Sequence, residues 1–231
     1  MMILTREDQM STQQYPYIVI DLSGHEGWLK GRQKGIGGSD AASVLGSNPF
    51  KTNVQLWEEK TGIRKPEDIS DKSYVRYGTA AEPLIRELFK LDYPEYTVEH
   101  HENRILRSTI HPFMQASLDG ELTDRDGRRG ILEIKTSNMM SASSWSKWED
   151  RIPDNYYCQI LHYLLVTGWD FAILRAHLIT SRGDDVRTSV RHYFIERSDV
   201  EDDLDYLAKA EQEFWDMVKT GRRPALILPE I

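Results

Sequence analysis

Two acids and a lysine are spaced so that they could hold one divalent cation. Asp119 precedes Gly120, and Glu133 and Lys135 flank Ile134 a few residues further along the chain. Side chains of a strand alternate between its faces, so Glu133 and Lys135 point the same way. Two neighbouring carboxylates repel unless a cation lies between them, and Mg²⁺ prefers such sparse carboxylate coordination. The pattern predicts a Mg²⁺ site, in which Mn²⁺ could substitute.

An alternative is that Glu133 and Lys135 form a surface pair and that Asp119 lies in an unrelated turn. Ile131 and Leu132 indicate instead that the strand is buried, where charge is costly without a partner. The buried setting favours the metal site.

A second group, Arg32 and Ser39, surrounds the glycine turn GIGG. A helix that starts there would present free N–H groups to a phosphate, while Arg32 adds a bidentate guanidinium and Ser39 a hydroxyl. The alternative is a turn between two helices in which Ser39 and Asp40 are only cap residues. Both interpretations place the start of a helix at Ser39.

The elements that position these groups can be read from hydrophobic spacing and turn residues. Residues 25–95 read as helices, including one with Thr52 as its cap and one with Leu84, Ile85, Leu88 and Phe89 at helical spacing. Residues 96–136 read as three short strands with turns at Asn103 and at Asp126-Gly127. A helix over about 153–167, two strands and a helix over 199–221 complete the chain.

This order predicts an α/β (α+β) fold with a central mixed sheet flanked by helices. We expect one domain over 1–231, with 1–20 as an N-terminal extension, 25–95 as the helical region, 96–198 as the sheet core and 199–221 as a C-terminal helix. The N-terminus lacks a basic start followed by an apolar block, so a cytoplasmic location is expected. The single cysteine, Cys158, excludes an internal disulfide and argues against a cysteine-bound iron–sulfur cluster.

The sequence resembles the YqaJ-like viral recombinase family, the lambda-type alkaline exonucleases of the PD-(D/E)xK superfamily. The resemblance rests on stretches that follow in the family's order: GRQKGIGGSDAASVLGSNPFKTNVQLWEEKTG, YGTAAEP, MQASLDG, LEIKT and YYCQILHYLLVTG. It implies a restriction-endonuclease-like core. One departure is Leu118, which stands where the family often has proline or a small residue before the aspartate.

Roles follow from the resemblance. Asp119, Glu133 and the Ile134 carbonyl would hold the principal Mg²⁺, and Glu82, near a helix start, would reach a second metal position. Lys135 would orient the attacking water, and Gln159 would help to position it. The alternatives are that Glu82 only complements a helix dipole and that Gln159 is a solvated helix residue.

The resemblance further implies a 5′-phosphate pocket formed by Arg32 and Ser39 with Ser117, and Trp145 is the aromatic expected to touch DNA. The expected activity is 5′→3′ degradation of one strand of duplex DNA to mononucleotides. The 3′ single-stranded tail would serve a single-strand annealing protein. A ring-shaped homotrimer, encoded by a phage or prophage, is also expected.

Two other functions remain open. An endonuclease of restriction or repair type would share the core chemistry, and a non-catalytic module could bind DNA ends. The net charge of −8 does not argue against DNA, because affinity depends on local basic clusters. Retention of Asp119, Glu133 and Lys135 favours an enzyme.

Overall fold

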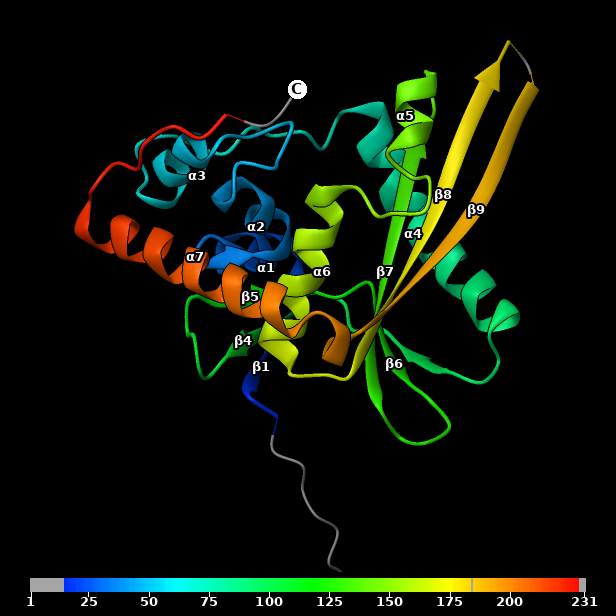
Figure 1. Cartoon of the computed structure of the whole chain (residues 1–231), viewed down its shortest axis with the longest axis horizontal. Helices are drawn as coiled ribbons and strands as arrows, with labels where there is room; N and C mark the ends of the chain where they lie inside the picture. Colours follow the sequence, from blue (N-terminus) through cyan, green and yellow to red (C-terminus); the bar gives the residue numbers. More distant parts are fainter. Residues whose placement is uncertain (1–14, 184, 229–231) are drawn as a thin grey trace, which may run out of the picture.

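The computed structural model describes residues 15–183 and 185–228 and contains two mixed β-sheets with helices packed on their faces (Figure 1). Sheet A has the strand order β1-β4-β5-β2, and sheet B has the order β3-β6-β7-β8-β9. The predicted α/β class is confirmed. The expected single central sheet is instead two sheets, and this division positions the candidate site.

The regular elements follow one another in an order close to the predicted one. They are β1 (Tyr17–Asp21), α1 (Gly24–Arg32), β2 (Ile36–Gly37), α2 (Gly38–Val44), α3 (Asn53–Lys60), α4 (Ser73–Asp92), β3 (Thr97–Glu99), β4 (Arg104–Ser108), β5 (Met114–Ala116), β6 (Gly120–Thr123), β7 (Arg129–Asn138), α5 (Ala142–Ser146), α6 (Asp154–Thr167), β8 (Phe171–Arg182), β9 (Asp185–Glu196), a 3₁₀ turn (Arg197–Asp199) and α7 (Glu201–Thr220).

The start of the described chain differs from the expected extension over 1–20. Residues 17–21 form β1, which pairs antiparallel with β4 at the edge of sheet A. The strand reads YIVID, in which three consecutive apolar residues follow Tyr17, so its sequence does not alternate. Residues 1–14 lie outside the described residues.

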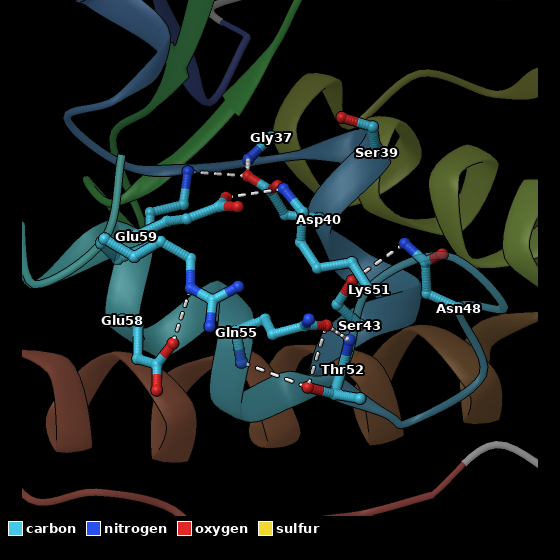
Figure 2. A network of polar contacts seen from close by, with 12 residues as sticks. Gly37, Ser39, Asp40, Ser43, Asn48, Lys51, Thr52, Gln55, Glu58 and Glu59 are labelled. Atoms are coloured by element: carbon cyan, nitrogen blue, oxygen red, sulfur yellow. Dashed lines mark hydrogen bonds and ion pairs between the residues drawn. The ribbon is translucent and has the colours of Figure 1, made fainter. Parts of the chain in front are cut away.

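The helical region confirms one cap and corrects another. Thr52 caps α3, since its hydroxyl accepts a hydrogen bond from Gln55 N at 3.2 Å. The N-cap of α2 is Gly37, so Ser39 and Asp40 lie inside its first turn. Asp40 accepts a hydrogen bond from Gly37 N at 3.1 Å and pairs with a lysine of α3, while Ser39 points away from this network (Figure 2).

The region predicted as three strands contains five, and its first two segments each divide between the sheets. The break between β3 and β4 contains Asn103, whose φ of 56° confirms the predicted turn, and Gly127 has a φ of 81° in the turn before β7. Asparagine and glycine tolerate such left-handed angles better than other residues. The break between β5 and β6 contains residues 117–119.

Helices cover both faces of sheet B. On one face, α6 and α7 pack with Ile131 and Leu174 in the larger core cluster; on the other, Ile85 and Phe89 of α4 pack against Leu132 (Figure 1). Two leucines predicted at helical spacing with them, Leu84 and Leu88, are exposed. No helix among the described residues is long and apolar enough to cross a bilayer.

Candidate active site

A cavity of about 600 Å³ opens where the two sheets meet. Sheet A contributes β2, β4 and β5, sheet B contributes β7, and α1, α2, α4, α6 and the segments before β4 and β6 supply the other walls. Most of the residues singled out from the sequence line it: Arg32, Ser39, Glu82, Ser117, Asp119, Glu133, Lys135 and Gln159. The structure therefore brings the metal group and the phosphate group into one cavity.

Asp119 and Glu133 converge across two adjacent strands. Asp119 immediately precedes β6, whose Gly120 lies in register with Leu132 of β7. Its carboxylate accepts a hydrogen bond from Ile134 N at 2.8 Å, while the Ile134 side chain packs into the core. Glu133 projects from the opposite face of β7 and is 1% exposed. Both carboxylates reach the same cavity, as the sequence predicts.

Glu133 has the most side-chain partners of the three acids. Its Oε1 lies 2.5 Å from Lys135 Nζ and accepts a hydrogen bond from Gln159 Nε2 at 2.7 Å. Gln159 Nε2 also lies 3.0 Å from the hydroxyl of Tyr163, one turn further along α6. The buried Oε2 of Glu133 has no hydrogen-bond partner among the described residues. One oxygen is thus held by protein, and the other is left for a ligand.

Glu82 reaches the cavity from the middle of α4. The helix begins at Ser73, so Glu82 is not near a helix start, and a favourable interaction with the helix dipole does not explain it. Arg86, one turn later, hydrogen-bonds the Glu82 carboxylate and donates from Nε to the Asp119 carbonyl at 2.7 Å. Arg86 therefore ties Glu82 to the strand that bears Asp119.

Burial raises the pKa of all three carboxyl groups, and repulsion from Asp119 raises that of Glu133 and Glu82 further. Burial and repulsion from Asp119 raise the pKa of Glu133 to about 8, against the pull of Lys135. Burial likewise raises the pKa of Asp119, and burial with repulsion from Asp119 raises that of Glu82. Burial alone would lower the pKa of Lys135, but Glu133 and Asp119 raise it. The three carboxyl groups therefore tend to stay protonated unless the site gains more positive charge than the Lys135 ammonium provides.

We expect the metal-free protein to lose thermal stability as the pH rises toward 8. The unfolded chain releases the Glu133 proton near pH 4.5, whereas the folded chain retains it until about pH 8. Between those values the unfolded state binds fewer protons, so stability falls with pH. Adding Mg²⁺ should raise the melting temperature more above pH 8 than near pH 6, because a ligand carboxylate must be deprotonated.

Scanning calorimetry with EDTA and with Mg²⁺ across this pH range measures both effects. Glu133→Gln, which cannot ionise, is the matched variant and should flatten the pH profile of the metal-free protein. A Mg²⁺-induced rise of equal size below and above pH 8 would contradict the assignment.

At the other end of the cavity, Arg32 lies beside Ser39, with Nη2 3.0 Å from the hydroxyl oxygen. The guanidinium stacks 4.5 Å from the ring centroid of Trp28. Several other arginines are paired with acids, for example Arg104 with Asp21. Arg32 has no carboxylate within ion-pair distance among the described residues. Its charge is therefore available to an anion.

A further group of potential metal ligands lies near the cavity rim. Ligand atoms of Glu99, His101 and Glu121 come within 4.8 Å of one another. Glu121, however, lies 2.7 Å from Arg129 Nη2 and 3.9 Å from Arg104 Nη1. Because these two arginines already balance its charge, we assign the group to the surface charge network.

The sequence missed several cavity residues and misplaced one. Trp28, Arg86, His100 and Tyr163 contact the site from distant segments, and no spacing rule connects them with Asp119. Only Tyr163 could have been found from the sequence, because it lies one helical turn after Gln159 and therefore on the same helix face. Trp145 does not line the cavity: it is half-buried and packs against the larger core cluster.

Comparison with known families agrees with this geometry. The profile of the YqaJ-like viral recombinase domain matches residues 27–170. The uncharacterized protein YqaJ of Bacillus subtilis (strain 168) is 35% identical over 204 residues, which make up 86% of this chain and 58% of that protein. The chain thus spans less than two thirds of its relative's length.

Solved structures share the fold at low sequence identity. An alkaline exonuclease (LHK-Exo) from Laribacter hongkongensis has a TM-score of 0.65 at 16% identity, covering 86% of this chain and 94% of that one. A phage related exonuclease from Haemophilus somnus 129PT has a TM-score of 0.52 at 13% identity, covering 81% and 96%. The overall fold is therefore similar to that of these two exonucleases.

Proposed function

The chain belongs to the YqaJ-like viral recombinase domain family, and on that basis we propose that it is a divalent-metal-dependent deoxyribonuclease acting from the 5′ ends of duplex DNA. The observation that carries the proposal is the convergence of Asp119, Glu133 and Lys135 on one cavity. An acid pair with a lysine can support hydrolysis of a phosphodiester, because it supplies ligands for a hard cation and a positive charge for the transition state.

The residues fit a hard divalent cation. Glu133 Oε2 is buried without a partner, and the mutual repulsion of three carboxylates is relieved when a dication is bound. Asp119, Glu133 and the Ile134 carbonyl would hold it, and Glu82 would serve a second position. A bound Mg²⁺ lowers the pKa of a ligand water and stabilises charge on the phosphate. Lys135 and Gln159 both contact Glu133 Oε1 and so fix the orientation of that carboxylate.

Arg32 and Ser39 support the part of the proposal that digestion starts at a 5′ end. A terminal 5′ phosphate carries more charge than an internal phosphodiester, and a guanidinium beside a hydroxyl suits it. With the terminal phosphate held there, the first phosphodiester bond would extend toward Lys135. The products would be 5′-mononucleotides and a 3′ single-stranded tail.

Arg32→Ala should reduce the preference for 5′-phosphorylated over 5′-hydroxyl ends by about tenfold or more, the effect of losing a charge-assisted hydrogen bond. The initial rates of digestion of the two duplexes measure it. Arg64→Ala, which removes an exposed arginine outside the cavity, is the matched control and should leave the ratio unchanged. If wild type and Arg32→Ala discriminate equally between the two kinds of 5′ end, Arg32 does not bind the terminal phosphate.

Exonuclease and endonuclease action are separated by substrate topology. Purified protein with Mg²⁺ is expected to degrade linear 5′-phosphorylated duplex and to leave a covalently closed circle intact, with EDTA stopping all degradation. Cleavage of the circle would favour an endonuclease on the same core. Binding of linear duplex without any degradation would favour a non-catalytic end-binding module.

The same proposal includes a homotrimeric ring around the DNA and delivery of the 3′ tail to a single-strand annealing protein. A ring would reconcile the net charge of −8 with a DNA substrate if basic residues face the channel and acids face outward. Light scattering gives the oligomer mass directly. A monomer at working concentration would refute the ring without affecting the assignment of the active site.

A further inference from the structure

Gln115 is a buried amide without hydrogen-bond partners. It lies in the middle of β5, and its side chain is only 3% exposed. Neither its Oε1 nor its Nε2 has a partner among the described residues, although its backbone carbonyl lies 2.9 Å from His162 Nε2. A buried polar group in this state destabilises the fold, so its retention calls for a ligand.

Gln115 is among the residues that line the cavity described above, which also include Gly37 and Ser39. Gln115 is in register with Gly37 of β2, the residue that precedes the turn bearing Ser39. Its Nε2 packs against Gly35, where an added Cβ would lie 2.6 Å away. The neighbouring polar side chains are satisfied by protein: Trp28 donates to Ser117 and Arg32 to Ser39. Gln115 differs from them in having both polar atoms unpaired.

Arg107 lies directly opposite Gln115 on β4. Directly opposed residues of an antiparallel pair project from the same face of the sheet. Arg107 Nε is also buried without a hydrogen-bond partner, and no carboxylate lies within ion-pair distance of this arginine among the described residues. Two unpaired donors and a positive charge without an ion-pair partner among the described residues therefore lie on the same face of sheet A, on directly opposed residues.

We propose that Gln115 is a specificity-determining residue for the 5′-terminal phosphate. Its Nε2 donates to a phosphate oxygen, and its Oε1 accepts from Arg107 Nε, which fixes the amide in that orientation. The Gln115 amide and Arg107 Nε then both have hydrogen-bond partners, and the positive charge of Arg107 acts on the anion through the amide. The inference rests on the proposed function, because it takes the cavity to be a pocket for a DNA end.

Gln115→Met tests the role, since it preserves length and removes both polar atoms. Binding is measured by fluorescence anisotropy in EDTA, where no cleavage occurs, with duplexes that differ only in a 5′ phosphate or 5′ hydroxyl. The ratio of the two affinities is expected to fall about tenfold, the loss of one hydrogen bond to a charged group, with hydroxyl-end affinity unchanged. Gln33→Met, an exposed glutamine at the end of α1, is the matched control.

Thermal stability separates a ligand-binding role from a structural one. Removing an unpaired buried amide should leave the melting temperature of Gln115→Met equal to or above that of wild type. A lower melting temperature with equal loss of affinity for both ends would overturn the inference in favour of a structural role. An unchanged affinity ratio in a stable variant would overturn it as well.

A different result would refute the 5′-phosphate pocket itself. If wild-type protein binds phosphorylated and hydroxyl ends equally, the 5′-phosphate pocket is refuted, and the role of Gln115 falls with it. If wild type discriminates and Gln115→Met does so equally, only the inference on Gln115 fails.

Discussion

Lys135→Ala is expected to lower turnover on linear duplex DNA by about 10²–10³-fold while leaving the affinity for DNA within a few-fold of wild type. The ammonium lies 2.5 Å from Glu133 Oε1 and lines the cavity. In the proposed reaction its positive charge would offset the charge that develops on the phosphate in the transition state. It would contribute less to ground-state binding, which many phosphate contacts would share.

Two conditions make the Lys135 experiment decisive. The pKa of Glu133, already about 8, will rise further without the neighbouring ammonium, so rates are compared above pH 8 at saturating Mg²⁺. Lys90→Ala removes an exposed lysine of α4 that pairs with Glu87, and it should leave turnover unchanged. Turnover within tenfold of wild type for Lys135→Ala, or DNA binding lost in parallel with it, would contradict the assigned role.

The second large effect concerns stability. Glu211→Ala should reduce the free energy of unfolding by about 3–5 kcal/mol, because it leaves a buried positive charge without its partner. Glu211 of α7 and His162 of α6 are both fully buried and lie 2.8 Å apart. The second imidazole nitrogen of His162 lies 2.9 Å from the Gln115 carbonyl, which can only accept, and Glu211 raises the pKa of the ring, so the contacts favour a charged imidazolium that donates from both nitrogens.

Urea denaturation at about pH 6 measures the loss. Burial alone would lower the pKa of His162, but Glu211 raises it above the ordinary value. The pair's contribution is therefore complete below the unfolded pKa of 6.5 and is lost as pH rises through the raised folded value. The exposed Glu213→Ala is the matched control, and replacing His162 and Glu211 together by leucine and methionine should restore much of the stability. A loss below 1 kcal/mol for Glu211→Ala would contradict a charged pair.

The chemistry of β7 could be predicted because it is local. Alternation along one strand fixes which of Glu133, Ile134 and Lys135 share a face, and the glycine after Asp119 marks a strand boundary. Similarly, Thr52 is recognisable as a cap from its own neighbours. In each case the physical cause acts within a few residues, so one segment of sequence contains it.

The division of the strands between two sheets could not be predicted, because alternation specifies a face and not a partner. Residues 96–108 read as one strand with a turn, yet β3 joins sheet B and β4 joins sheet A. The same holds for Arg86, whose contact with the Asp119 carbonyl joins residues 33 positions apart. The choice of Gly37 over Ser39 as the cap of α2 depends on β2 pairing with β5, which is also a long-range contact.

The helix α4 shows a related limit. Leu84, Ile85, Leu88 and Phe89 form two adjacent apolar rows, and the sequence gives no reason to prefer one row over the other. Packing against Leu132 buries the row of Ile85 and Phe89 and leaves Leu84 68% exposed. Trp145 was misplaced for the opposite reason, since a residue in a polar segment packs against the core.

The short connection between β5 and β6 has a consequence for the size of the expected product. Residues 117–119 alone separate β5 of sheet A, which carries Gln115, from β6 of sheet B, whose neighbour β7 carries Glu133. In the proposed function, a segment so short, held by the hydrogen bond from Ser117 Oγ to the Arg104 carbonyl, would fix the distance between the anchor for the chain end and the metal site. Such an enzyme would release fragments of one fixed length, whatever the bases are.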